Sequence, residues 1–210
     1  MKHQQRSPEQ TIAVIILAAG SSSRLGKPKQ LLDFQTETFI KHTVKTALQT
    51  ACKPIIVVNG FLQEELNLEM ENLPVKVVHN PDWEQGIGSS IRAGTTALSK
   101  IESSDQIDAV LILLCDQPLI TAQHLNQLIT QFYLDKRSIA ATNYAAIQGV
   151  PAIFGKSLFP ILQTLPGDRG AQWLFKEYQD QLTVVPFEGA AIDVDTEDDY
   201  LRLLKLSEEQ

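Results

Sequence analysis

The feature that most constrains the fold of this chain is a series of short apolar runs, each followed by a segment with a helical pattern. The runs are rich in Val, Ile and Leu and cover residues 12–19, 54–59, 75–79, 109–116, 138–142 and 150–154, with two weaker runs at 182–187 and 191–195. A strand that is apolar at every position needs cover on both faces, which is typical of a mainly parallel sheet between two helical layers. The sequence therefore predicts a three-layer α/β/α fold with a mainly parallel, mixed sheet.

The segments between the runs carry apolar residues at helical spacing. Such residues form one face in each of three segments: Ile40, Val44 and Leu48; Leu125, Leu128, Ile129 and Phe132; and Tyr200, Leu203 and Leu204. Thr121 is a candidate N-cap for the second of these helices. Thr196 and Asp199 have the spacing of a capping box, which predicts the start of a last helix.

Length and composition indicate one globular domain. The 210 residues are 43% apolar and 20% charged, which is enough to bury a full core. We expect residues 1–10 to form a disordered polar tail and residues 11–210 to form a single globular α/β domain, because no repeat or low-complexity linker divides the chain. The tail lacks the apolar stretch of a signal peptide, and no apolar run approaches the roughly 20 residues of a membrane span.

Charge and cysteine usage narrow the class of partner. The net charge of −7 argues against nucleic acid, whose binding proteins concentrate Lys and Arg to meet phosphates. It is compatible with a small anionic ligand held by a few cations. Cys52 and Cys115 lie far apart and lack metal-ligand spacing, so we interpret them as reduced thiols of a cytoplasmic protein.

Ligands of mainly parallel sheets bind beyond the carboxyl ends of the strands, so the segments that follow the runs are the candidate sites. The first of them, GSSSRLGKP at residues 20–28, is a turn of the kind that binds phosphate on backbone N–H groups. It is not a Walker loop, because Pro28 takes the place of the magnesium-binding hydroxyl, and it lacks the middle glycine of a dinucleotide fingerprint. Arg24 offers a planar fork for phosphate oxygens, and Lys27 and Lys29 add positive charge.

A candidate metal ligand follows the most apolar run of the chain. Asp116 ends this run directly before Gln117 and Pro118. A carboxylate there needs solvent, a cap or a cation, because burying it unpaired is costly. Mg²⁺ takes one or two carboxylates together with phosphate oxygens, which suits this position. The alternative is an aspartate that only forms the turn before a proline.

Residues 17–32, LAAGSSSRLGKPKQLL, resemble the L-A-A-G-x-x-x-R-[ML]-G-x-x-K-x-L signature of the molybdenum cofactor cytidylyltransferase-like (MobA-like) nucleotidyltransferases. The resemblance continues in NPDWEQGIGSSIRAG at 80–94, LLCDQPLI at 113–120, GVPAIFG at 149–155, LPGDRGAQWLF at 165–175 and IDVDTEDDYLRL at 192–203. It covers nearly the whole chain beyond the tail. The resemblance implies the Rossmann-like fold of the nucleotide-diphospho-sugar transferases.

The resemblance also implies a reaction. A phosphate of the acceptor attacks the α-phosphorus of an NTP, pyrophosphate leaves, and Mg²⁺ is the expected cofactor. The L-A-A-G start resembles the CTP users of the family more than the GTP users, so CTP is the favoured nucleotide. Molybdopterin is the expected acceptor, with a molybdoenzyme or its chaperone as a protein partner. The alternatives are a small sugar- or alditol-phosphate nucleotidyltransferase and a nucleotide-binding regulator without turnover.

The same resemblance implies roles for individual residues. Lys29 matches the signature lysine, and the expected catalytic residues are Arg24, Lys29 and Asp116. The expected nucleotide-binding residues are Leu17, Ala18, Ala19, Gly20, Ser21, Ser90, Gly94 and Arg169. Arg169 either pairs with the acceptor phosphate or is an exposed arginine beside a helix N-cap.

A second metal ligand is expected from the IDVDT segment near the C-terminus. Asp193 and Asp195 point to the same side if this segment is an extended strand. Asp193 is the first choice, which gives Asp116 and Asp193 as the predicted metal ligands. Asp195 is the alternative, because it can instead serve the N-terminus of the following helix.

Overall fold

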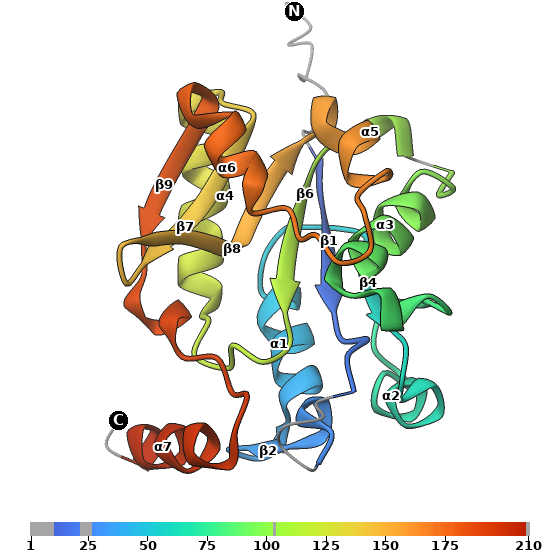
Figure 1. Cartoon of the computed structure of the whole chain (residues 1–210), viewed down its shortest axis with the longest axis vertical. Helices are drawn as coiled ribbons and strands as arrows, with labels where there is room; N and C mark the ends of the chain where they lie inside the picture. The colour runs from blue at the N-terminus through green and yellow to red at the C-terminus, as the bar shows by residue number, and fades with distance from the viewer. Residues whose placement is uncertain (1–10, 22–26, 103, 209–210) are drawn as a thin grey trace, which may run out of the picture.

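A seven-stranded mixed sheet forms the centre of the structure, with helices on both of its faces (Figure 1). The computed structural model describes residues 11–21, 27–102 and 104–208. In spatial order the strands are β5 (Lys76–His79), β4 (Ile55–Asn59), β1 (Thr11–Leu17), β6 (Ile107–Leu114), β8 (Ile147–Gly155), β7 (Ile139–Tyr144) and β9 (Leu182–Pro186). A separate two-stranded ribbon is formed by β2 (Asp33–Phe34) and β3 (Glu37–Thr38).

The strand directions bring several carboxyl ends to one edge of the sheet. β1 pairs in parallel with β4 and β6, β4 with β5, and β7 with β9. Among the described strands of this sheet only β8 runs the other way, antiparallel to β6 and β7. The predicted mainly parallel, mixed sheet is therefore confirmed, and the segments after β1, β4 and β6 all lie at the edge where ligands bind.

Two apolar layers bury the faces of the sheet. The helices are α1 (Phe39–Leu48), α2 (Gln63–Glu69), α3 (Ile87–Leu98), α4 (Ala122–Asp135), α5 (Phe159–Leu162), α6 (Trp173–Glu177) and α7 (Glu197–Glu208). On β1, Val14 and Ile16 pack in one layer with α1, α2 and α4, whereas Ala13 and Ile15 pack in the other with α3, α5 and α6. Alternate residues of a strand point to opposite faces, so a strand between two such layers is apolar throughout. The three-layer prediction is confirmed.

Both predicted helix starts are present. The Thr121 hydroxyl accepts a hydrogen bond from the His124 N–H at 3.2 Å and caps α4. At the start of α7 the Thr196 hydroxyl accepts from the Asp199 N–H at 3.2 Å, while the Asp199 carboxylate accepts from the Thr196 N–H at 2.9 Å. This reciprocal pair satisfies two backbone donors that a helix end otherwise leaves unpaired.

The strand predicted at 191–195 is wrong. Residues Glu188–Ala191 form a short 3-10 helix, η6, and no strand follows it before α7. β9 already lies at the edge of the sheet, and after Pro186 the chain crosses the carboxyl ends of the strands instead of pairing again. The Val194 N–H donates to the Asp116 backbone oxygen at 3.2 Å, which ties this segment to the end of β6.

Other expectations concern the termini and the cysteines. The tail predicted over residues 1–10 lies outside the described residues. Cys52 and Cys115 are both free and buried. Burial, with a smaller effect of the Asp116 charge, raises the pKa of Cys115 to about 12, so this thiol is not a nucleophile near neutral pH. No helix in the described part of the chain is long and apolar enough to span a membrane.

Candidate active site

A cavity of about 230 Å³ opens at the carboxyl ends of β1 and β6. Its described walls are Leu17, Ala18, Ala19, Gly20, Lys29, Gln30, Trp83, Gly86, Ile87, Ser90, Leu114, Cys115 and Asp116. Three predicted segments meet here: the turn after β1, the first turn of α3 and the end of β6. The position follows the general rule that open α/β sheets bind ligands beyond the carboxyl ends of their strands.

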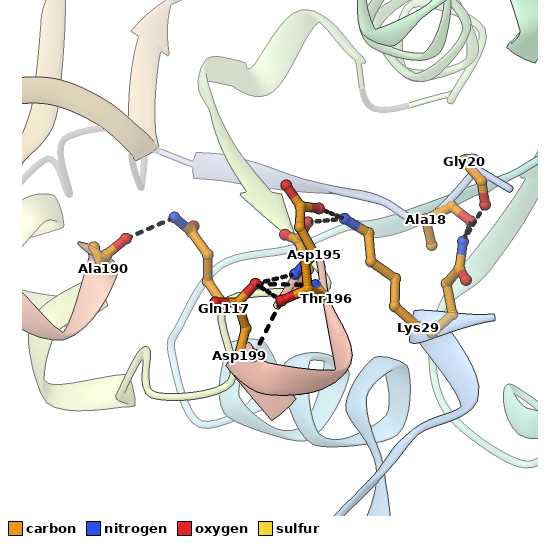
Figure 2. A network of polar contacts seen from close by, with 10 residues as sticks. Ala18, Gly20, Lys29, Gln117, Ala190, Asp195, Thr196 and Asp199 are labelled. Carbon is orange, nitrogen blue, oxygen red and sulfur yellow. Dashed lines mark hydrogen bonds and ion pairs between the residues drawn. The ribbon is translucent and has the colours of Figure 1, made fainter. Parts of the chain in front are cut away.

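Lys29 is the charged centre of this cavity. It belongs to a short 3-10 helix, η1 (Lys29–Leu31), and its ammonium donates hydrogen bonds to the carboxylates of Asp116 and Asp195, the latter at 3.0 Å (Figure 2). Asp116 follows β6 and Asp195 precedes α7, so three distant parts of the chain meet at one nitrogen. Lys29, at the end of the cationic turn, and Asp116, at the end of β6, therefore lie side by side.

The carboxylates keep Lys29 charged. Burial alone lowers the pKa of a lysine, because the ammonium loses its hydration. At Lys29 the charge of Asp116 and the hydrogen bonds to Asp116 and Asp195 outweigh this effect, and the pKa lies above its ordinary value. The side chain is thus a protonated cation at neutral pH, held where it can meet the negative oxygens of a ligand.

Asp116 retains an unused binding capacity. The residue is 8% exposed, and its Oδ1 atom is buried with no hydrogen-bond partner among the described residues. A buried carboxylate oxygen without a donor is costly unless a cation or a donor group reaches it. The described residues contain no cluster of three or more His, Cys, Asp or Glu side chains arranged to hold a metal. One or two carboxylates fit Mg²⁺, which completes its octahedron with water and phosphate oxygens.

Gln30 holds the two ends of the phosphate turn. Its side chain is buried, and the amide Nε2 donates to the Ala18 carbonyl at 3.0 Å and to the Gly20 carbonyl at 2.6 Å (Figure 2). These two carbonyls lie between the end of β1 and the start of the turn, so their hydrogen bonds to Gln30 fix the direction in which the backbone leaves β1. Gln30 is a functional candidate that the sequence analysis missed. The sequence signal that could have indicated Gln30 is its position, since it is a polar residue between the signature lysine and two leucines.

A second cavity of about 240 Å³ adjoins the first. The two cavities share Leu17, Ile87 and Leu114. The walls of the second are otherwise mostly apolar, and Asp193 is its one charged residue in the described part of the chain. Partial burial, followed by the charge of the nearby Asp116, raises the pKa of Asp193 to about 6. Asp193 therefore lines the second cavity, whereas Asp195 contacts Lys29 of the first, and the two residues do not act as one pair of alternate strand positions.

The remaining predicted residues fall into three groups. The first cavity is lined by Leu17, Ala18, Ala19, Gly20, Lys29, Ser90 and Asp116. Ser21 and Arg169 are described residues outside its wall, and the exposed Arg169 guanidinium stacks over the Trp173 ring at 4.9 Å. Arg24 lies outside the described residues.

Gly94 has a packing role in the structure. It lies on α3 away from the cavity, where a Cβ atom would stand 2.8 Å from Ile15 Cγ2 and 3.0 Å from Val58 Cγ2. A side chain at this position would push α3 off the sheet, because backbone-bound Cβ atoms essentially never approach so closely. The glycine thereby supports the position of the first turn of α3, which does line the cavity.

The match to a family model decides the family of this chain. Residues 14–182 match the model of the MobA-like NTP transferase domain. The chain belongs to this family. It is a nucleotidyltransferase with the fold of the nucleotide-diphospho-sugar transferases, and the cavity at the carboxyl ends of β1 and β6 is its candidate active site.

Three related proteins illustrate the range of names in this family. Nicotine blue oxidoreductase of Paenarthrobacter nicotinovorans is 28% identical over 201 residues, 90% of this chain and 95% of that protein. The purine catabolism protein PucB of Bacillus subtilis (strain 168) is 31% identical over 201 residues, 89% of this chain and 92% of that protein. The molybdenum cofactor cytidylyltransferase of Escherichia coli (strain K12) is 39% identical over 88 residues, 41% of this chain and 45% of that protein.

Solved structures agree with the fold along most of the chain. The crystal structure of Rv0371c from Mycobacterium tuberculosis H37Rv is similar with a TM-score of 0.79 at 29% identity, and the match covers 93% of this chain and 98% of that chain. A structure of the same protein in complex with manganese gives a TM-score of 0.77 at 28% identity, with coverages of 93% and 99%. A divalent metal is therefore present in one of the structural neighbours of this chain.

Proposed function

We propose that this nucleotidyltransferase transfers CMP from CTP to a phosphorylated acceptor, with molybdopterin as the acceptor, and releases pyrophosphate in a Mg²⁺-dependent reaction. The observation that carries the proposal is the Lys29 ammonium held between Asp116 and Asp195 on the wall of a cavity that begins at the phosphate turn. One cation and two carboxylates at a glycine-rich turn provide opposite charges for a triphosphate and for its metal ion. The reaction class needs this charge pattern more than it needs a nucleophilic side chain.

The proposed reaction is an in-line substitution at the α-phosphorus. An oxygen of the acceptor phosphate forms the new bond to this phosphorus, and the bond to the oxygen that bridges to the β-phosphate breaks, so pyrophosphate leaves with the bonding electron pair. Lys29 stabilises the negative charge that develops on the α-phosphate and on the leaving group. The proposal assigns the remaining phosphate oxygens to the backbone of the turn between Gly20 and Lys29 and to the Arg24 guanidinium, which is expected from the sequence alone.

Asp116 is the proposed first ligand of Mg²⁺, which fits its buried Oδ1 atom without a partner in the described structure. When bound, Mg²⁺ supplies positive charge that polarises the phosphate oxygens and makes pyrophosphate a better leaving group. The second carboxylate belongs to the segment before α7. Asp193 is the choice made from the sequence, whereas the shared hydrogen bonds of Lys29 favour Asp195 as the partner of Asp116.

The second cavity is the proposed site of the acceptor body. It adjoins the nucleotide cavity through Leu17, Ile87 and Leu114, and its described walls are mostly apolar and carry no cationic side chain. A phosphate group is therefore unsuited to its interior and belongs at the junction near Lys29, while a flat ring system fits between apolar walls with a polar edge toward Asp193. This arrangement supports a heterocyclic acceptor such as molybdopterin over a sugar phosphate, whose many hydroxyls need polar partners.

CTP is proposed as the nucleotide on two grounds. The L-A-A-G start resembles that of the CTP users, and the related molybdenum cofactor cytidylyltransferase is 39% identical over 88 residues. A cytoplasmic location and contact with a molybdoenzyme or its chaperone would follow from this role, because the product has to reach an apoenzyme.

The direct test is pyrophosphate release with each of the four NTPs, with and without molybdopterin, in the presence of Mg²⁺. We expect turnover only with CTP and molybdopterin together. Lys29→Ala and Asp116→Ala should each lower kcat by about 10²- to 10³-fold or more while circular dichroism shows a folded protein. Lys45→Ala is the matched control, because Lys45 of α1 pairs with Glu37 of β3 and does not line the cavity. Full turnover by either cavity variant would contradict the role proposed for that residue.

A further inference from the structure

We propose that Asn80 is a positioning residue for nucleobase recognition, because its side-chain amide fixes the Ser90 hydroxyl as a hydrogen-bond donor toward the nucleotide cavity. The inference rests on the proposed function in one respect, which is that this cavity binds an NTP. It adds the direction of one hydrogen bond to the base, with Ser90 as the donor, and the residue that fixes this direction, Asn80.

The orientation of the Asn80 amide is determined by its partners. Asn80 follows β5 and is 2% exposed. Its Oδ1 atom accepts from the Asp82 N–H at 3.0 Å, which identifies the oxygen end of the amide. The Nδ2 end donates one hydrogen to Ser89 Oγ at 2.8 Å and the other to Ser90 Oγ at 3.0 Å. Both amide hydrogens are thus in use, and a flipped amide would lose the contacts with the Asp82 N–H and with Ser89, keeping a contact only by accepting the Ser90 proton.

The hydroxyl groups of Ser89 and Ser90 differ in whether they donate a hydrogen bond within the protein. Ser89 donates its proton to the Gly86 carbonyl at 2.7 Å, so its donor is satisfied inside the protein. Ser90 accepts from Asn80, but its proton has no acceptor among the described residues. Ser90 is 4% exposed and lines the nucleotide cavity. Since a hydroxyl has a single donor, and Asn80 occupies one of its two acceptor positions, the free Ser90 proton is the group available to a ligand.

This polarity selects the chemistry of the ligand atom. The atom that meets Ser90 has to be a hydrogen-bond acceptor, such as a carbonyl oxygen or an unprotonated ring nitrogen of a nucleobase. Cytosine presents two such acceptors, O2 and N3, next to each other. An exocyclic amine at the same point would face a second donor and leave the buried Ser90 proton unpaired, which is the costly outcome for a buried polar group.

The test is a binding experiment without acceptor, so that it does not depend on turnover. Calorimetry measures the affinity of the wild-type protein for Mg²⁺ complexes of CTP, UTP, ATP and GTP. Asn80→Asp keeps the size of the side chain and the acceptor for the Asp82 N–H, but removes both N–H donors, so Ser90 donates its proton to the new carboxylate. We expect the affinity for CTP to fall about tenfold in Asn80→Asp and in Ser90→Ala.

A double-mutant cycle separates positioning from packing. If Asn80 acts through Ser90, Asn80→Asp in the Ser90→Ala background should change the affinity less than twofold. In the Ser89→Ala background, the matched control, the tenfold loss should persist, because Ser89 contacts Asn80 but does not line the cavity. Should Asn80→Asp fail to fold, Asn80→Ala in the same backgrounds replaces it, with a loss expected only where Ser90 is present.

Two results would overturn the inference. Only the second of them would also overturn the proposed function. Equal losses from the Asn80 variant with and without the Ser90 hydroxyl would show that Asn80 only packs, while the NTP site itself stands. A wild-type protein that binds none of the four Mg²⁺–NTP complexes would overturn the proposed function and this inference together.

Discussion

Three polar side chains hold the site together at the scale of single residues, and each bridges two or more other groups. Lys29 joins two carboxylates, Gln30 joins two carbonyls at the phosphate turn, and Asn80 joins two hydroxyls. Replacing one of these side chains leaves buried groups unpaired, which costs about 1–3 kcal/mol for each neutral group. The three residues therefore affect both stability and function, and their variants need a measurement of each.

Gln30→Ala is expected to weaken nucleotide binding more than it weakens the fold. Without the amide, the carbonyls of Ala18 and Gly20 lose their donor and the phosphate turn loses its fixed start. We expect a loss of about 1–3 kcal/mol in the free energy of unfolding and a rise of about tenfold in KM for CTP. Denaturant unfolding and steady-state kinetics measure the two effects. An unchanged KM would mean that the turn keeps its conformation without Gln30.

The second metal ligand can be decided between Asp193 and Asp195. Because Asp195 shares Lys29 with Asp116 and Asp193 lines the neighbouring cavity, Asp195→Asn should weaken Mn²⁺ binding in the presence of CTP by about 10- to 100-fold, and Asp193→Asn by much less. Electron paramagnetic resonance of free Mn²⁺ gives both affinities. The reverse order would restore Asp193 as the ligand.

At the scale of elements, one buried histidine links α4 to the β7–β8 pair. His124 on α4 stacks on Phe187 with ring centroids 4.4 Å apart, and its Nε2 atom lies 2.8 Å from the Thr142 hydroxyl. Thr142 uses its own proton for the Pro151 carbonyl at 2.7 Å, so Nε2 carries the hydrogen and donates. Burial lowers the pKa of His124 to about 4, and the imidazole is neutral in the folded protein.

Acid should therefore destabilise the protein through His124. As the pH falls from about 6.5 toward about 4, the unfolded state binds a proton that the folded state does not, so the free energy of unfolding decreases. This contribution is fully present above pH 6.5. We expect His124→Gln to remove about 1–3 kcal/mol of the loss between pH 7 and pH 4, measured by urea unfolding at both values. An identical pH dependence in both proteins would show that His124 is not the group responsible.

The elements also show which parts of the structure were open to prediction. The continuous apolar runs identify the central strands. Both faces of such strands are buried, so consecutive residues are all apolar and the pattern is visible in the sequence. The run at 191–195 is misleading because its one deeply buried residue, Val194, packs against Phe34 and Leu203 instead of in a sheet. Lys29 and Asp116 were recognisable from local motifs. The hydrogen bonds of Gln30 and the contact of Asp195 with Lys29 join residues that are separated in the sequence. Local sequence patterns do not predict such contacts, because they depend on the tertiary structure.

At the scale of the whole molecule, the metal is expected to serve the reaction and not the fold. The described residues hold no cluster of three or more metal-binding side chains, and the sheet is buried by apolar layers on both faces. Excess chelator should therefore abolish turnover while it changes the free energy of unfolding by less than about 0.5 kcal/mol. Adding Mg²⁺ and CTP at 100 times the Kd should stabilise the protein by about 2.7 kcal/mol. A large loss of stability with chelator alone would indicate a structural metal.

The contact between Lys29 and Asp195 joins residues 166 positions apart, and the Val194 N–H fixes the segment that makes it possible. A nascent chain on the ribosome has its glycine-rich turn and Asp116 long before it has this last carboxylate. Synthesis that terminates anywhere before residue 195 leaves Lys29 without the Asp195 carboxylate. The site thus gains this partner of Lys29 only after the whole sheet has been synthesised, and we expect products that end before residue 195 to lack full activity.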